Sequence, residues 1–477
     1  SKNWHFIENE YHLYQGPWFH GITIFEVPPE TKMELELVIA YALWGNVPAA
    51  SHSNLSLIGY AKNQFWDQVA IGSFGESFCY DPDVGLGRSM IDDIRPLMVT
   101  DLHGREKSWD WTHNIGGGDF LVYRDDNGVE GWPQPLVGMK TYYRNYAPNL
   151  TSVTYSGITA DESIRARITV SHPRTDDINR AFHSFRYDVI KPIEFNRLAF
   201  YQLGADGYND NQFNKIAYGN SLGVMQEWNP RENETRLTGY HEKGIKLEGE
   251  MPWVSLHESF LSENYNGAFA NRGLIIRNWN AVIGGKEVPV PYGGVYLTND
   301  RYLSANFELL PPPEITKLLP GDFIECELEI IILPQFANDY YGPNEALRLS
   351  LEQDPDSWRQ VLRQAIGNNV NVAVNQGEIE KEYPVRIKLD ENQIAEFAIK
   401  GGLAYLPITF TGLNQYRSPI LEELLDDIWV PVDQSFFGND FWQTYYDSNI
   451  GKWEITYNIN MDESSEKKLR FSFKQEG

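Results

Sequence analysis

The chain has 477 residues, of which 42% are hydrophobic and 14% aromatic, a balance typical of a folded globular protein rather than a disordered one. Its 66 acidic residues outnumber the 40 lysines and arginines, and the formal net charge of −26 disfavours nucleic acid and anionic membranes as partners. No stretch approaches the roughly 18 uninterrupted apolar residues that a membrane-spanning helix needs.

Short apolar or alternating runs recur along the whole chain, with Gly and Pro residues between them. The clearest predicted strands are residues 33–44, 163–172, 195–203, 273–279, 323–333 and 384–390. No period of 20 to 50 residues repeats, which disfavours propellers and solenoids. The sequence therefore predicts an all-β protein, a large antiparallel β-sandwich with long aromatic and acidic loops.

One segment departs from the strand pattern. Residues 344–369 have apolar side chains at helical spacing, with Pro355 as a break and two asparagines at the end, so we expect one or two short helices there. The proline-rich stretch 310–323 runs directly into strong strands and is typical of a loop within a fold. We therefore expect one sandwich unit over residues 1–477, with a C-terminal strand subdomain at 370–477 as an open alternative.

The segment 71–98 combines glycines with polar and charged residues. Glu76 lies beside Phe74 and Phe78, and an apolar wall favours the neutral form of a carboxyl, which suits a general acid. Further on, Asp93 precedes Arg95, which could hold it as a carboxylate base or nucleophile. A turn acid and a surface salt bridge are the structural alternatives for these residues.

The segment SWDWTHNIGGGDF, residues 108–120, is rich in aromatic and polar side chains. Pyranose rings have apolar C–H faces and polar hydroxyls, so a sugar site needs aromatic platforms beside hydrogen-bonding groups. Trp109, Trp111, His113 and Asp119 supply that mixture, and the three glycines allow close approach of the backbone. Alternatively, both tryptophans fill gaps in the core and the glycines form a wide turn.

The segment 171–188 holds two adjacent acids with several arginines, His183 and Tyr187. Such residues could serve a polysaccharide lyase, in which a tyrosine or histidine removes a proton and Arg or Asn binds the uronate. A ladder of cross-strand ion pairs is the interpretation that we favour here.

Two later loops are rich in oxygen-bearing or aromatic side chains. Residues 204–214 could hold a structural calcium ion, although they lack the spacing of an EF-hand and more often form a plain turn. Residues 432–449 repeat the aromatic and acidic composition of 108–120, with Asp440 and Trp442. We therefore expect the loops 71–120 and 433–447 to face each other across one groove.

With its late strands GDFIECELEIIILP (321–334) and its aromatic, acidic loops, the chain resembles the large sandwiches of carbohydrate-active enzymes. These include the galactose-mutarotase-like supersandwich folds of glycoside hydrolases and polysaccharide lyases. The resemblance implies a large β-sandwich and a glycan substrate, and it brings no family's catalytic residues with it.

The leading hypothesis is a glycoside hydrolase that cleaves a polysaccharide or oligosaccharide with a pair of carboxyl groups. Glu76 and Asp119 are the predicted reacting acids, with Asp93 or Asp440 as substitutes. The predicted substrate-binding residues are Trp109, Trp111, His113, Arg95 and Trp442. A polysaccharide lyase and a non-catalytic glycan-binding protein are the alternatives.

We expect no metal or cofactor in the chemistry, and a structural calcium ion is the one ligand of this kind that the sequence leaves open. The chain begins SKNWHF without a methionine or an apolar leader, which fits a processed form. With a polysaccharide as substrate, we expect a secreted or periplasmic location. The sequence does not predict an oligomeric state.

Overall fold

The computed structural model describes most of the chain from residue 116 onwards and short stretches before it. The described residues are 29, 31–32, 55–58, 68–71, 76–79, 90–91, 94, 97–100, 108–111, 116–124, 136–147, 149–173, 179–205, 215–232, 238–257, 270–298, 305–334, 362, 370–402, 404–432, 442–461 and 466–474. Every element named within them is a β-strand, which confirms the all-β sandwich class. Most of residues 344–369, where the sequence predicts helices, lie outside the described residues. The described part holds no helix long and apolar enough to cross a membrane.

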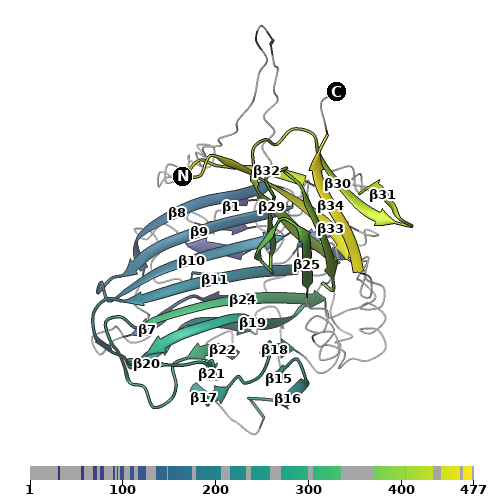
Figure 1. Cartoon of the computed structure of the whole chain (residues 1–477). Helices are drawn as coiled ribbons and strands as arrows, with labels where there is room; N and C mark the ends of the chain where they lie inside the picture. Colours follow the sequence, from purple (N-terminus) through teal and green to yellow (C-terminus); the bar gives the residue numbers. More distant parts are fainter. Residues whose placement is uncertain are drawn as a thin grey trace, which may run out of the picture.

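A ten-stranded antiparallel sheet forms the centre of the fold (Figure 1). Its strands, in spatial order, are β16 (Gly223–Trp228), β15 (Lys215–Asn220), β18 (Trp253–His257), β19 (Ala270–Ile283), β24 (Phe323–Pro334), β11 (Asn179–Val189), β10 (Ile164–Pro173), β9 (Leu150–Thr159) and β8 (Leu136–Ala147), with β20 (Lys286–Glu287) beside β19. Along β10, buried residues alternate with more exposed ones, because successive side chains of a strand point to opposite faces. The sheet therefore has an apolar inner face and a more polar outer face.

A smaller five-stranded sheet packs on the inner face of the ten-stranded sheet. It consists of β17 (Gly239–Lys246), β21 (Tyr292–Leu297), β22 (Ala305–Leu310), β14 (Tyr201–Ala205) and β6 (Gly118–Asp119). Tyr201 of β14 stacks on Phe185 of β11, with ring centroids 6.1 Å apart, and both belong to the main apolar core. Two short strand pairs accompany it: β7 (Val122–Arg124) with β13 (Arg197–Ala199), and β12 (Ile193–Glu194) with β23 (Lys317–Leu318).

Before β6, the structure describes two small antiparallel sheets without their side chains. One contains β1 (Leu55–Ile58), β2 (Gln68–Ile71) and β3 (Glu76–Cys79), and the other contains β4 (Leu97–Thr100) and β5 (Ser108–Trp111). The predicted residues Glu76, Trp109 and Trp111 therefore lie in strands, not in loops.

The strands from residue 371 onwards form two five-stranded sheets with a core of their own, called here the C-terminal sandwich. One sheet is β25 (Asn371–Gln376), β28 (Ala395–Lys400), β34 (Glu466–Phe473), β30 (Pro419–Leu425) and β31 (Ile428–Pro431). The other is β26 (Glu378–Lys381), β27 (Val385–Lys388), β29 (Ala404–Leu413), β33 (Lys452–Met461) and β32 (Trp442–Asp447). Phe397, Phe410 and Phe471 lie at the centre of its core, where Phe410 and Phe471 stack at 4.2 Å.

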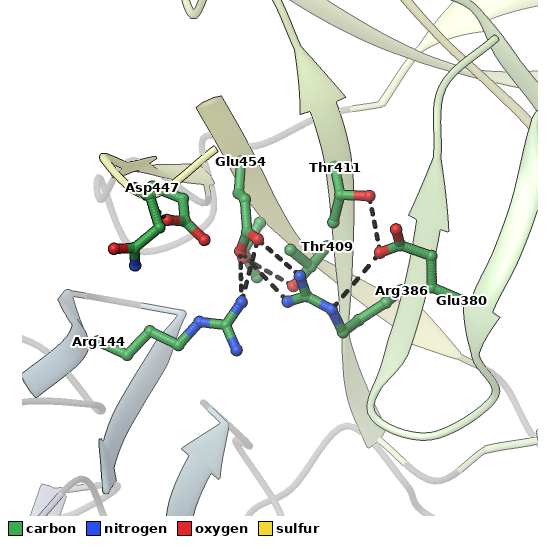
Figure 2. A network of polar contacts seen from close by, with 9 residues as sticks. Arg144, Glu380, Arg386, Thr409, Thr411, Asp447 and Glu454 are labelled. Carbon is green, nitrogen blue, oxygen red and sulfur yellow. Dashed lines mark hydrogen bonds and ion pairs between the residues drawn. The ribbon is translucent and has the colours of Figure 1, made fainter. Parts of the chain in front are cut away.

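The C-terminal sandwich packs on the outer face of the ten-stranded sheet, opposite the smaller sheet. Phe182 of β11 points to this outer face and meets Tyr383 at 4.8 Å between ring centroids. Ion pairs add to the contact, and Figure 2 shows Glu454 of β33 between Arg144 of β8 and Arg386 of β27. The ten-stranded sheet thus has one neighbouring layer on each face.

Candidate active site

Of the nine side chains that the sequence predicts for the site, the structure describes one, Asp119. The other eight lie outside the described side chains, whether or not their backbone is placed: Glu76, Asp93, Arg95, Trp109, Trp111, His113, Asp440 and Trp442. The proposed calcium loop, apart from residues 204 and 205, also lies outside the described residues. Within the part of the chain that the structure describes, no three His, Cys, Asp or Glu side chains gather as a metal site.

Asp119 lies in a row of polar side chains that crosses three strands of the smaller sheet. Gln202 of β14 pairs with Asp119 of β6 on one side and with Glu308 of β22 on the other. Tyr201 and Leu203 belong to the core, so alternation places Gln202 on the face of the smaller sheet that turns away from the ten-stranded sheet. Asp119, Gln202 and Glu308, called here the carboxyl row, therefore share this outward face.

Asp119 is 8% exposed, and its Oδ1 accepts hydrogen bonds from the backbone N–H groups of Phe120 at 2.9 Å and Met90 at 3.4 Å. Burial disfavours the charged carboxylate and raises the pKa of Asp119 to about 7, although these backbone donors act in the opposite direction. The nearby charge of Glu308 adds to the rise. Asp119 can therefore carry a proton near neutral pH.

Glu308 is fully buried and has donors on both carboxylate oxygens. Arg197 Nη2 and Gln202 Nε2, the latter at 2.7 Å, donate to Oε1, and the Tyr240 hydroxyl donates to Oε2. Burial and then the charge of Glu308 raise the pKa of Tyr240 above its ordinary value, so this hydroxyl keeps its proton. The two carboxyls of the row therefore differ: Asp119 favours the neutral form, and Glu308 is held by a cation and two further donors.

Arg197 lies between Glu308 and two aromatic rings. Its guanidinium carbon is 3.6 Å from the ring centroid of Tyr296 and 5.5 Å from that of Tyr240, at cation–π distance. Its Nη1 atom is buried and has no hydrogen-bond acceptor among the described residues. The site thus offers one donor beyond those that hold Glu308.

The glycines before Asp119 are required by close packing of the backbone. A Cβ atom on Gly118 would lie 2.3 Å from the carbonyl oxygen of Gln202, and Gly116 has φ +125°, which favours glycine. The carbonyl oxygen of Gly117 also accepts a hydrogen bond from Gly204 N–H at 2.8 Å. These glycines let the short strand β6 lie against β14, which places Asp119 beside Gln202.

The segment 179–189 contributes support to the site from the core. The Tyr187 hydroxyl donates to the carbonyl oxygens of Phe120 and Phe200, which fixes the residue that follows Asp119. His183 is also buried, with Nδ1 2.8 Å from the Tyr201 hydroxyl. Both side chains lie inside the sandwich, so neither has the open position that a lyase base would need. Arg180 forms a buried ion pair with Glu329, in agreement with the ion-pair interpretation.

The segments around Asp119 and Trp442 do not share a groove. Asp119 belongs to the sheet on the inner face of the ten-stranded sheet, whereas β32 belongs to the sandwich on the outer face. Gln443 of β32 accepts from the backbone N–H groups of Asn149 and Leu150, at the turn between β8 and β9. For the described parts of 71–120 and 433–447, the expectation of one shared groove is wrong, because the ten-stranded sheet lies between them.

Sequence reasoning missed the other members of the site, Glu308, Gln202, Arg197 and Tyr240. A signal was present for Glu308, which is the one charged residue in the strand ANFELL (305–310), all of whose residues are buried. A buried charge needs partners, so an acid in such a strand indicates an ion-pair network or a site. The partners themselves come from residues 68, 106 and 111 positions away along the chain.

No family model and no curated protein matches the chain. Solved structures do match: the α-galactosidase AgaA of Geobacillus stearothermophilus, with 10% identity, 46% of this chain, 30% of that chain and a TM-score of 0.27. The galactosidase domain of an α-galactosidase–sucrose kinase matches with 12% identity, 61% of this chain, 38% of that chain and a TM-score of 0.30. A polysaccharide lyase matches with 11% identity, 81% of this chain, 43% of that chain and a TM-score of 0.20.

The chain spans less than half the length of each of these three proteins. The partial structural likeness to glycoside hydrolases and to a polysaccharide lyase confirms a resemblance to carbohydrate-active enzymes, with no specific family matched. Identities near one tenth transfer no residue role to this chain.

Proposed function

We propose that the protein is a carbohydrate-active enzyme, a glycoside hydrolase that uses Asp119 and Glu308 as its two reacting carboxyls. The observation that carries the proposal is the pairing of a protonatable buried acid, whose pKa is raised to about 7, with a carboxylate held by Arg197 on the same sheet face. Glycosidic cleavage needs one carboxyl that donates a proton and one that stays ionised.

Asp119 acts as the general acid in this proposal. Its neutral form donates a proton to the glycosidic oxygen as the bond to the leaving sugar breaks. Because its pKa is raised to about 7, this form persists at pH values where an exposed aspartate is ionised. The backbone N–H groups of Met90 and Phe120 then stabilise the carboxylate that remains.

Glu308 acts as the base that activates water. Adjacent strands lie about 4.8 Å apart, so two strand spacings place the Cα atoms of Asp119 and Glu308 roughly 10 Å apart. Carboxyls about 5 Å apart suit retention, and a separation of about 6.5–9.5 Å leaves room for a water molecule and suits inversion. The row therefore favours an inverting hydrolase, in which the free Nη1 donor of Arg197 contacts a sugar hydroxyl.

The substrate in this proposal is a neutral or weakly charged glycan. The net charge of −26 opposes a polyanionic chain. Because Asp119 is 8% exposed and Glu308 is buried, turnover requires the glycan to reach the outward face of the smaller sheet. A secreted or periplasmic location would suit such a substrate.

The test is a panel of neutral and uronate-containing polysaccharides and their short oligosaccharides, with detection of new reducing ends. We expect at least one neutral glycan to be cleaved, and Asp119→Asn to lower turnover by about 10²–10⁴-fold with little change in the thermal midpoint. Normal cleavage by Asp119→Asn would refute the assignment. Ultraviolet absorbance of unsaturated product ends would instead indicate a lyase, because only β-elimination forms them.

A further inference from the structure

Three aromatic rings gather at one edge of the C-terminal sandwich, on elements that do not contribute to the carboxyl row. Tyr446 of β32 and Trp453 of β33 form a cross-strand pair, with ring centroids 4.9 Å apart. Tyr416, in the turn between β29 and β30, lies 4.3 Å from Trp453 on the same measure. These residues, called here the ring cluster, come from three separate segments of the chain.

The ring cluster is both exposed and firmly supported. Tyr446 is 38% exposed, and the neighbouring Ile450 is 61% exposed. Tyr416 and Trp453 are half-buried and pack against the apolar core of the sandwich. The rings are inclined to each other by 42° and 50°, so together they form a curved surface whose position is set by the core beneath it.

Polar groups surround the ring cluster. Lys452 Nζ donates to Asn414 Oδ1 at 2.5 Å, and Asp447 accepts from the backbone N–H of Asn449 at 2.9 Å. Lys452 and Asp447 are a cross-strand pair next to Tyr446 and Trp453. Aromatic faces with alternating donors and acceptors at their rim match a sugar chain, which has apolar C–H faces and hydroxyl edges.

We propose that the ring cluster is a second glycan-binding surface, separate from the site of cleavage, that holds a neutral polysaccharide chain. This inference rests on the proposed function for the class of ligand. The ten-stranded sheet lies between the C-terminal sandwich and the carboxyl row, so one short oligosaccharide does not reach both. The surface therefore binds a polymer and raises its local concentration, without contact with the scissile bond.

The charge and the chemistry of the surface favour a neutral glycan over other occupants. The overall charge of −26 repels anionic chains, and Lys452 and Asp447 balance each other at the rim. An obligate protein partner favours a larger and more apolar surface than three rings with a charged rim. Stacking on rings that are already held by the core also costs little conformational entropy.

Affinity electrophoresis of the full chain through gels that contain a glucan, a galactomannan or a xylan tests the proposal. We expect at least one gel to retard the wild-type protein and Tyr446→Ala to bind that polysaccharide about tenfold more weakly. Tyr142→Ala is the matched control, because Tyr142 is 55% exposed on β8, away from the ring cluster, and its removal should change nothing.

Tyr446→Phe and Tyr416→Ala complete the set. The phenylalanine keeps the ring and should keep binding, whereas Tyr416→Ala should weaken binding as Tyr446→Ala does; a thermal midpoint for each variant checks that it is folded. No retardation of the wild-type protein in any gel, or equal retardation of wild type and Tyr446→Ala, would overturn the proposal.

The two proposals fail separately. Tyr446→Ala should cleave short oligosaccharides at the wild-type rate, and Asp119→Asn should be retarded in the gel as strongly as wild type. Loss of cleavage with retained, Tyr446-dependent retardation would refute the hydrolase assignment alone.

Discussion

Two glutamates with no exposed surface, Glu308 and Glu329, lie on opposite sides of the fold and have different surroundings. Glu329 of β24 receives hydrogen bonds from two arginines, Arg180 and Arg277, beneath the C-terminal sandwich. Burial alone would raise the pKa of Glu329, but the two arginines outweigh it and hold that pKa below its ordinary value. Glu308 has one arginine, an amide and a phenol, and an acid with a raised pKa two strands away.

The difference separates a structural ion cluster from a candidate site. Two cations around Glu329 more than compensate its charge, and both faces of the cluster are covered by packed layers. In the carboxyl row, two acids share one arginine, which has a spare Nη1 donor with no acceptor among the described residues. An excess of acid and a free donor are features that a substrate can complete, whereas a saturated cluster has nothing left to bind.

The largest expected effect is on turnover. Glu308→Gln should lower the turnover number on the cleaved glycan by about 10²–10⁴-fold, because the amide cannot accept a proton from water. Glu329→Gln is the matched substitution and should leave the turnover of the folded protein unchanged. Equal losses in the two variants would show that the contrast between the two glutamates is not functional.

The second effect is on stability, and it reverses the order of the two regions. Glu329→Gln leaves Arg180 and Arg277 buried with no full countercharge, and breaking a buried pair costs roughly 3–5 kcal/mol in the free energy of unfolding. Glu325→Gln on the same strand removes a half-exposed partner of Arg186 and should change little. Denaturant unfolding of both variants measures this, and a stable Glu329→Gln would contradict a structural role for the cluster.

A third effect concerns pH and Asp119. Its pKa rises from 3.8 to about 7 on folding, about three units at about 1.4 kcal/mol each, or about 4 kcal/mol. Because the folded pKa is the higher one, this stabilisation is complete below pH about 4 and is lost as the pH rises towards 7.

The measurement is the free energy of unfolding of wild type and Asp119→Asn between pH 4 and 8. The difference between the two should shift in favour of the variant as the pH rises through this window, and wild-type turnover should fall above pH about 7 as the acid loses its proton. A difference that does not change with pH would show that Asp119 has an ordinary pKa.

The fold was largely predictable because alternation is a local property. The predicted strands at 163–172 and 323–333 correspond to β10 and β24 within one residue at each end. The run 195–203 was predicted as one strand but spans β13 and the start of β14, because the chain changes its pairing partner from β7 to β22 at Phe200. Such a change of partner is a tertiary event and leaves no local pattern.

The site was less predictable for the same reason. Asp119 was chosen from its aromatic and glycine-rich surroundings, yet its raised pKa comes from burial by distant segments. Glu308 was missed because its three partners come from three other strands. The similar composition of 108–120 and 432–449 suggested one groove, but composition carries no information on which face of the ten-stranded sheet a segment reaches.

The smallest expected effect concerns a third glutamate, Glu454, which resembles Glu329 in having two arginine partners (Figure 2). Here the partners are more exposed: the side chain of Arg144 is 42% exposed and that of Arg386 is 21% exposed. Arg144 comes from the ten-stranded sheet, whereas Arg386 belongs to the same C-terminal sheet as Glu454. Arg144→Ala therefore removes only the contact between the two bodies, and water can replace part of it.

We expect Arg144→Ala to lower the free energy of unfolding by less than about 1 kcal/mol, as for a half-exposed pair, and Arg386→Ala to lower it by about 1–3 kcal/mol. Denaturant unfolding followed by tryptophan fluorescence compares the two variants. If Arg144→Ala is the more damaging, the contact between the layers is a main source of stability, and Glu454 belongs with Glu329. If the order is as expected, the saturated cluster at Glu329 holds the C-terminal sandwich on the ten-stranded sheet, and Glu454 serves chiefly to neutralise Arg386 within its own sheet.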